Sequence, residues 1–285
     1  MRFAFKTSPQ NTTWADMLAV WKAADDIDVF ESGWTFDHFY PIFSDPTGPC
    51  LEGWVTLTAL AQATTRLRVG VLVTGIHYRH PAVLANMAAT LDIVSGGRLE
   101  LGIGAGWNEE ESGAYGIELG SVKERFDRFE EACQVLIGLL SQETTTFDGR
   151  FYQLTDARNE PKGPQRPHPP ICIGGSGEKR TLRITAQYAD HWNFVGGPPE
   201  EFARKRDVLA AHCADVGRDP NDILLSAHVR LNDDHDYDRV VDEAGALGAE
   251  GLDLAIVYLP PPYDPAALEP LAEKLRASGL TSKEN

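Results

Sequence analysis

The feature that most constrains the fold of this chain is a repeated alternation of short apolar, β-branched runs with longer segments of helical periodicity. Some runs, such as 67–74, are almost continuously apolar, as a parallel strand covered on both faces requires. Eight such pairs fit into 285 residues, and no shift in composition marks a domain boundary. The pattern predicts one α/β domain, residues 1–285, folded as a closed (β/α)₈ TIM barrel.

The expected strands are 2–6, 34–39, 67–74, 98–104, 170–174, 191–195, 224–231 and 252–259. The expected helices are 14–30, 53–64, 81–94, 121–140, 178–188, 199–216, 238–247 and 265–277. Residues 144–169 are rich in Pro, Gly and charge, and we interpret them as an insertion between units four and five that either covers the site or acts as a spacer. The polar segment 278–285 is expected to be a frayed tail.

Charge and cysteine content exclude several classes of function. The chain has 26 Lys and Arg against 42 Asp and Glu, and a net charge of −16 disfavours binding to nucleic acid or to anionic membranes. No apolar run has the length of a signal peptide core or a membrane helix. We therefore expect a cytoplasmic protein without metal. Four dispersed cysteines show neither zinc nor redox-motif spacing: Cys50, Cys133, Cys172 and Cys213.

Candidate chemistry follows the expected strands, at the rim where (β/α)₈ barrels hold their sites. The segment Gly174–Gly177 joins a strand to a helix, and glycines with free N–H groups at a helix start favour an anion. This loop is a candidate phosphate site, and the alternative is a tight strand-to-helix turn. Lys179, Arg180 and Arg183 follow it and are either a basic patch for an anionic ligand or a solvated helix turn.

Asp37 and His38 form a second candidate, because a histidine beside a carboxylate can act as a general acid or base. The alternative is a histidine satisfied by local hydrogen bonds. The pattern Gly-x-Gly-x-Gly at 102–106 lacks the spacing of a dinucleotide fingerprint but allows a flat ligand to approach. We expect no capped helix in 108–120, and we expect the run Glu109–Glu111 to be a solvated loop.

Five stretches of the chain occur in a characteristic order: Ser32–Phe39, Val73–Leu91, Ser95–Asn108, Pro170–Gly177 and Ala189–Phe194. Together they resemble the bacterial luciferase-like family of flavin and deazaflavin oxidoreductases. The resemblance implies a (β/α)₈ barrel, usually a homodimer, that binds coenzyme F420 or FMN at the rim and acts on a small-molecule substrate. The subset that the chain resembles most uses F420 and transfers a hydride at the deazaflavin C5.

The same resemblance implies roles for individual residues. His38 would be the catalytic acid or base near the reacting carbon. A bulge with a non-prolyl cis peptide would back the ring, and a loop after a later strand would hold the phosphate. The ring-backing residues are Leu72, Val73, Thr74 and Gly75; the phosphate-loop residues are Ile173, Gly174, Gly175, Ser176 and Gly177; further contacts would come from Asp37 and Asn108 to the head and Asn193 to the tail.

Two positions depart from the sugar-phosphate dehydrogenases of the family. Ala105 stands where they carry a glutamate proton donor, and Ile42 stands where they carry a tryptophan. The departures favour an F420H₂-dependent reductase acting on an organic electrophile, such as an enone or an imine. Two alternatives stay open: an FMN-dependent monooxygenase that uses reduced flavin and O₂, and a non-catalytic protein that binds flavin or deazaflavin.

Overall fold

The computed structural model describes residues 1–281, and it confirms the closed parallel barrel. Its pairing order is β3-β2-β1-β11-β10-β9-β8-β5, and a β3–β5 pairing closes the ring, with β4 continuing β3 beside β5. The strands are β1 (Arg2–Lys6), β2 (Phe30–Thr35), β3 (Arg68–Val71), β4 (Thr74–Gly75), β5 (Leu99–Gly104), β8 (Ile171–Gly174), β9 (His191–Phe194), β10 (Leu224–Arg230) and β11 (Leu254–Tyr258).

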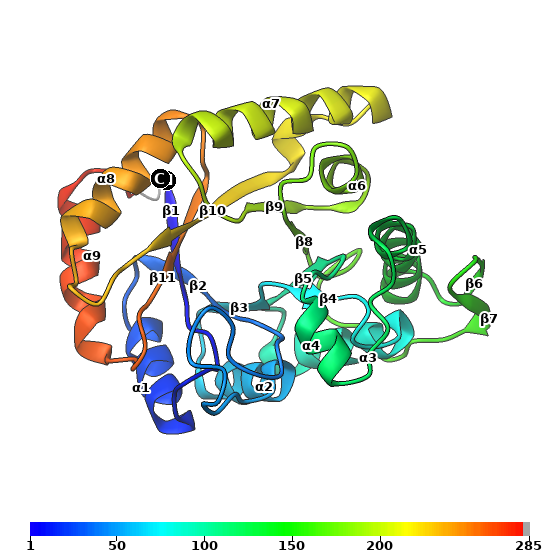
Figure 1. Ribbon diagram of the computed structural model, residues 1–285, viewed down its shortest axis with the longest axis horizontal. Helices are drawn as coiled ribbons and strands as arrows, with labels where there is room; N and C mark the ends of the chain where they lie inside the picture. Colours follow the sequence, from blue (N-terminus) through cyan, green and yellow to red (C-terminus); the bar gives the residue numbers. More distant parts are fainter. Residues whose placement is uncertain (282–285) are drawn as a thin grey trace.

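Helices connect the strands and surround the barrel (Figure 1). Their apolar faces pack on the outside of the strands in one continuous core, to which Trp21, Phe129 and Phe202 contribute large buried side chains. The helices are α1 (Trp14–Asp25), α2 (Gly53–Ala63), α3 (Pro81–Ser95), α4 (Glu109–Ala114), α5 (Val122–Ser141), α6 (Thr181–Tyr188), α7 (Pro199–Val216), α8 (Tyr237–Ala249) and α9 (Leu268–Ala277). No helix of residues 1–281 has the length and apolarity needed to cross a membrane.

The first helix and the second strand differ from the expected bounds of 14–30 and 34–39. Helix α1 already ends at Asp25, because the run of acidic residues that follows is unfavourable at the negative end of a helix. The Asp25 carboxylate instead accepts backbone N–H groups from Thr65, at 2.7 Å, and from the residues after it. Strand β2 therefore begins at Phe30 and ends at Thr35, which leaves Asp37 and His38 in the loop beyond it.

The expectation of an uncapped, solvated loop after β5 is wrong. Asn108 is the N-cap of α4, and its side chain accepts the N–H of Glu111 at 3.1 Å. The acidic run suits this position, because negative side chains in a first turn interact favourably with the positive end of the helix dipole. Glu111 is not solvated at all: its exposed fraction is 0%.

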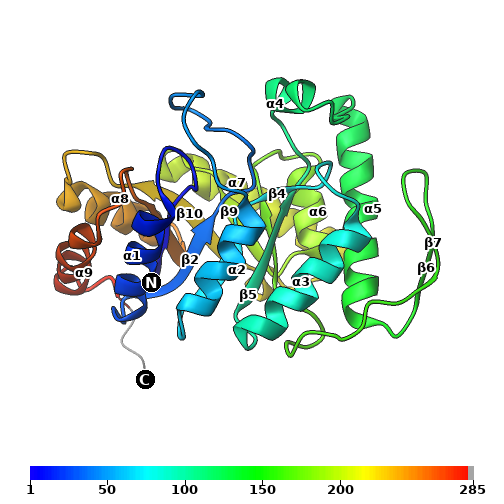
Figure 2. The same cartoon turned by 90° about the horizontal axis from the view of Figure 1, so that it is seen from below.

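The insertion at 144–169 contains an antiparallel hairpin, β6 (Thr145–Asp148) and β7 (Gln153–Ala157). Glu131 of α5 accepts backbone N–H groups of the hairpin turn, including that of Phe151 at 2.8 Å. The hairpin lies on the flank of the barrel beyond α5, whereas α4 lies at one end (Figure 2). The insertion thus does not contribute to the lining of the cavity described below.

The chain end that we expected to be frayed is only partly described. Ser278 follows α9 and its hydroxyl donates to the Leu275 carbonyl at 2.7 Å. The Leu280 carbonyl accepts the amino group of Met1 at 2.8 Å. The rest of the expected tail, residues 282–285, lies outside the described residues.

Candidate active site at the carboxyl ends of the strands

A cavity of about 470 Å³ opens where the barrel strands end, and every strand or the loop after it contributes to its lining. Much of its wall is apolar, with Phe126 and Phe129 of α5 on one side. The structure brings these predicted residues into the lining: His38, Leu72, Val73, Gly75, Gly174, Gly175 and Asn193. The other predicted residues lie outside the lining: Asp37, Thr74, Asn108, Ile173, Ser176 and Gly177.

His38 is held by a buried carboxylate from a different strand loop. Its Nδ1 lies 2.7 Å from an oxygen of Glu111, and its exposed fraction is 9%. The other Glu111 oxygen accepts the Phe39 N–H at 2.6 Å, and the Tyr78 hydroxyl donates to the same oxygen as His38. Because Nδ1 is engaged, Nε2 is the ring nitrogen available to a molecule in the cavity.

The charge of Glu111 follows from these contacts. Burial opposes its ionisation, but hydrogen bonds from His38, Tyr78 and the Phe39 backbone outweigh burial and lower its pKa. An ionised Glu111 fixes the orientation of the His38 ring through its contact with Nδ1. The sequence analysis missed Glu111, although the Asn108-x-x-Glu111 spacing, which is typical of a capped helix start, could have indicated it.

Asp37 and Asn108, which we expected to contact the cofactor head, have side chains engaged within the protein. Asp37 is almost fully buried in a two-bond ion pair with Arg79, one bond of which measures 3.1 Å. Burial raises the pKa of Asp37, and Arg79 opposes that effect. Thr74, expected in the ring-backing bulge, likewise accepts the indole N–H of Trp54 at 2.8 Å.

The junction of β3 and β4 projects towards the cavity. The Leu72–Val73 peptide is cis, which confirms the expected non-prolyl cis bond in this segment. Glycines lie against the junction, and a Cβ added at Gly104 would lie 2.9 Å from the Val73 side chain. At Gly174 the corresponding distance is 3.1 Å. Larger residues at these positions would therefore crowd the junction and narrow the space in front of it.

The loop after β8 has the features of an anion site. Gly175 has a φ of +122°, a conformation that favours glycine, and its carbonyl accepts the Trp192 indole N–H at 2.8 Å. Ser176 has a buried hydroxyl oxygen without a hydrogen-bond partner. Helix α6 then begins at Thr181 without a side-chain cap. A phosphate group would supply partners for such a loop and helix start.

The basic residues beside this loop are not equally available. The Arg180 guanidinium pairs with Asp127 of α5 at 2.8 Å and lies over the Phe126 ring, 5.6 Å from its centroid. Lys179 and Arg183 are exposed. Only these last two are available to extend the site along a charged ligand.

Two aromatic side chains stand at the mouth of the cavity. The rings of Phe43 and Trp107 are parallel to within 1°, with centroids 5.5 Å apart. Phe43 is 86% exposed and Trp107 is 51% exposed. Phe43 also has a φ of +55°, in the left-handed region that bulky residues rarely occupy, and such residues cluster at binding sites.

His77 and His80 each have a separate hydrogen-bond partner. His77 Nε2 lies 3.1 Å from the Ser112 hydroxyl, and His80 caps α3 by accepting the N–H of Ala82. Within residues 1–281, no group of three His, Cys, Asp or Glu side chains is arranged to hold a metal ion.

Comparison with known proteins identifies the family of this barrel. The sequence profile of the luciferase-like monooxygenases matches residues 1–278. The chain belongs to this family. It is therefore an oxidoreductase, and membership of a family of enzymes argues against a non-catalytic binding protein.

Relatives in this family differ in cofactor. The chain is 30% identical to an F420-dependent glucose-6-phosphate dehydrogenase from Microbacterium testaceum, over 83% of this chain and 70% of the relative. It is 36% identical to the pyrimidine monooxygenase RutA from Methylobacterium radiotolerans over 59% of this chain, but it spans only 44% of that protein. An FMNH₂-dependent dimethylsulfone monooxygenase from Pseudomonas putida is 31% identical, over 79% of this chain and 58% of the relative.

Solved structures show the same fold at lower identity. An F420-dependent secondary alcohol dehydrogenase superposes with a TM-score of 0.85 at 20% identity, covering 97% of this chain and 98% of that one. The F420-dependent tetrahydromethanopterin reductase from Methanopyrus kandleri gives 0.82 at 18% identity, covering 96% and 97%.

Proposed function

We propose that this enzyme transfers a hydride between coenzyme F420 and a small organic substrate, and that it acts as an F420H₂-dependent reductase. The observation that carries the proposal is the His38–Glu111 pair, which places an oriented acid or base at the wall of an apolar cavity. The F420-dependent relative that matches most of the chain supports the choice of cofactor.

The residues of the cavity fit a flat ring with a phosphate-bearing tail. The ring would lie against Leu72 and Val73, where Gly104 and Gly174 leave room. The phosphate would lie at the loop after β8, where the Ser176 hydroxyl lacks a partner. When bound in its reduced form, F420 supplies a hydride from C5, which carries two electrons and one proton.

The chain itself supplies the remaining proton. His38, held at Nδ1 by Glu111, donates a proton from Nε2 to the substrate atom next to the carbon that receives the hydride. The substrate then gains two electrons and two protons, and solvent reprotonates His38. The apolar walls from α5 exclude water from the reacting atoms.

Two observations bear on substrate class and on the alternative cofactor. Ala105 lines the cavity where sugar-phosphate dehydrogenases carry a glutamate, which favours a different substrate. The pairing of Arg180 with Asp127 favours the second candidate, an FMN-dependent monooxygenase, because FMN ends in one phosphate and needs fewer cations along its tail.

Titration of the protein with F420 and separately with FMN, at low and at high salt, tests the proposal. We expect tight F420 binding that salt weakens, because the F420 tail is polyanionic, and weak FMN binding. The reverse preference would assign the enzyme to the flavin monooxygenases, and oxygen uptake with FMNH₂ would then be the next assay. The proposal includes a cytoplasmic homodimer, which cell fractionation and light scattering test.

A further inference from the structure

Three basic side chains gather on one side of the cavity, at the ends of β1 and β10. Lys6 and Arg230 are both in register with Tyr258, the last residue of β11 between them. The Lys6 Nζ lies 4.8 Å from the Tyr258 ring centroid, and the Arg230 guanidinium carbon lies 5.0 Å from it. The His228 ring meets the same tyrosine edge-on, at 5.4 Å between centroids. All four residues line the cavity.

The two cations of this cluster have no carboxylate partner in residues 1–281. Lys6 is only 3% exposed, and its ammonium group donates to the Leu72 carbonyl at 2.7 Å. Arg230 influences the pKa of Glu243 of α8, but the Glu243 carboxylate pairs with Arg239, at 3.6 Å. A buried cation without a counter-charge is unfavourable, and such groups are ordinarily paired.

His228 adds an unpartnered polar atom to the same place. Its Nε2 is buried and has no hydrogen-bond partner, while the ring is hydrogen-bonded to the backbone of Val195. Burial, together with Lys6 and Arg230, lowers the pKa of His228 well below its usual range. Burial likewise lowers the pKa of Lys6. A negative charge bound here would oppose both shifts, because it stabilises the protonated forms of Lys6 and His228.

The cluster is distinct from the candidate phosphate loop. Strand β9 separates β8, which carries that loop, from β10, which carries His228 and Arg230, and Lys6 lies two strands further along, on β1. On its other side, β1 pairs with β2, and His38 follows β2. Lys6 and His38 therefore belong to neighbouring strands or their loops, and both line the cavity.

We propose that Lys6, Arg230 and His228 form an oxyanion subsite that holds a carboxylate of the substrate. The inference deepens the function proposed above and rests on it: the substrate is a small organic acid whose carboxylate binds this cluster while its unsaturated carbon lies near His38. In a chain of net charge −16, these local cations attract the acid against the overall field.

Calorimetric titration with benzoate, and with benzamide as its uncharged counterpart, tests the subsite without turnover. We expect the protein to bind benzoate at least about tenfold more tightly than benzamide, and we expect Lys6→Met and Arg230→Gln to remove that preference. Arg230 is exposed, so Arg230→Gln keeps the test valid if Lys6→Met folds poorly. Lys22→Met, an exposed change on α1, is the matched control and should keep the preference.

Titration of the same variants with F420 distinguishes the two ligands that could supply an anionic oxygen to this cluster, the substrate and the cofactor. Unchanged F420 affinity with lost benzoate preference supports a substrate subsite. Lost F420 affinity with an intact benzoate preference would overturn the inference and assign the cluster to the cofactor. No preference for benzoate in the unmodified protein would also overturn it. Because the benzoate arm needs no cofactor, failure to bind F420 would overturn the proposed function and leave this result standing.

Discussion

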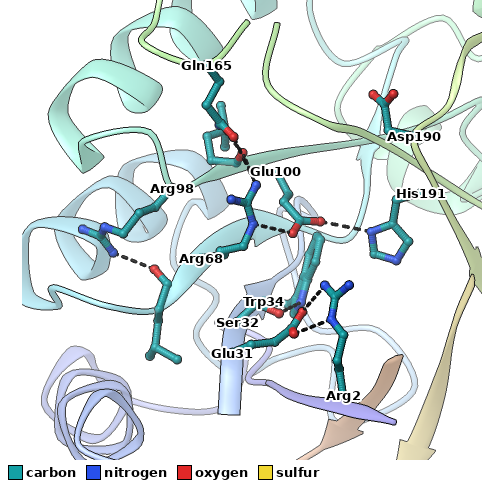
Figure 3. Close-up of polar contacts among 12 residues, drawn as sticks. Arg2, Glu31, Ser32, Trp34, Arg68, Arg98, Glu100, Gln165, Asp190 and His191 are labelled. Atoms are coloured by element: carbon teal, nitrogen blue, oxygen red, sulfur yellow. Dashed lines mark hydrogen bonds and ion pairs between the residues drawn. The ribbon is translucent and has the colours of Figure 1, made fainter. Parts of the chain in front are cut away.

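The two ends of the barrel differ in whether their buried polar groups have partners within the protein. At the amino ends of the strands, Glu100 of β5 lies between Arg68 and His191, and the contacts continue outward to Gln165 (Figure 3). At the carboxyl ends, Lys6 has no carboxylate partner, and the His228 Nε2 has no hydrogen-bond partner. At the amino ends, Arg68, Glu100 and His191 bond to one another, and we call this the closed end. At the carboxyl ends, polar groups are left available to a ligand.

The closed end is a network of hydrogen bonds and ion pairs. Arg68 Nε donates to one Glu100 oxygen at 2.8 Å, and His191 Nδ1 lies 3.0 Å from the other. His191 Nε2 is 2.6 Å from the Ser226 hydroxyl. Burial opposes the ionisation of Glu100, but the contacts with His191 and Arg68 outweigh it and lower its pKa to about 2. A fully partnered network of this kind stabilises one arrangement of the strands.

The difference teaches where to look for function in such a fold. Most buried polar groups in proteins have partners, so the exceptions call for an explanation. Two of the exceptions, at Ser176 and His228, lie in or beside the cavity, and so does Lys6, which has a carbonyl partner but no carboxylate. Glu100 and His191 at the opposite end have partners. Substitutions at the two ends should accordingly separate loss of activity from loss of stability.

The largest effect is expected at His38. His38→Ala should lower turnover per folded molecule by about 100- to 10,000-fold, because it removes the proton donor. Urea unfolding gives the folded fraction, since the change also leaves the buried Glu111 carboxylate without one partner. Steady-state kinetics and a cofactor titration check this. An equal loss of cofactor affinity would show that His38 is a binding contact rather than an acid or base.

The next effect belongs to the closed end. Glu100→Gln should lower the free energy of unfolding by about 3 kcal/mol, because it breaks a buried ion pair, and should leave turnover per folded molecule unchanged. Urea denaturation measures the first quantity. Glu143→Gln, at an exposed pair with Arg158, is the control and should change stability by less than about 1 kcal/mol. If Glu100→Gln lost turnover while its free energy of unfolding stayed unchanged, the closed end would serve activity rather than stability, which contradicts this comparison.

A smaller effect is expected for Glu111, which acts through His38. Glu111→Gln keeps the size of the side chain but removes the carboxylate that orients the His38 ring, so kcat should fall by roughly tenfold. KM and the cofactor Kd should stay within about twofold, since Glu111 is fully buried behind His38. A change in KM with an unchanged kcat would indicate that Glu111 shapes the cavity instead.

The smallest effect is a pH dependence at the closed end. The pKa of Glu100 is lowered from 4.5 to about 2, so its stabilising contribution is complete above pH 4.5 and is lost as the pH falls towards 2. The stability deficit of Glu100→Gln should therefore narrow between about pH 7 and about pH 3. Urea unfolding at several pH values measures it, and a constant deficit would contradict the assigned ionisation.

The barrel could be predicted from the sequence because its signal is repeated and local. Apolar runs such as 67–74 alternate with amphipathic segments, and each pair reports one unit of the fold. The bounds of α1 and β2 were wrong because residues 26–39 contain apolar residues throughout, and only pairing with β1 selects Phe30 as the start of the strand.

Site residues that directly follow a strand could be predicted from the sequence. Those whose role depends on contacts between distant segments were missed. His38 follows a strand, and its position at the rim could be inferred. Composition does not distinguish Glu111 from Glu109 and Glu110, and only the spacing from Asn108 does, because burial of one carboxylate among three depends on how α4 packs on the loop after β2. Lys6 was missed for a related reason: its lack of a counter-charge is a property of three neighbouring strands.

One hydroxyl connects the two ends of the barrel. Ser226 accepts the side-chain N–H of Asn193 at 2.9 Å, while Asn193 also lines the cavity and His191 contacts the same hydroxyl. If a ligand draws the Asn193 amide away, the hydrogen bonding of Ser226 to the His191 ring changes with it. The nitrogen chemical shifts of His191 are thus a natural spectroscopic reporter, buried far from solvent, of whether the opposite end is occupied.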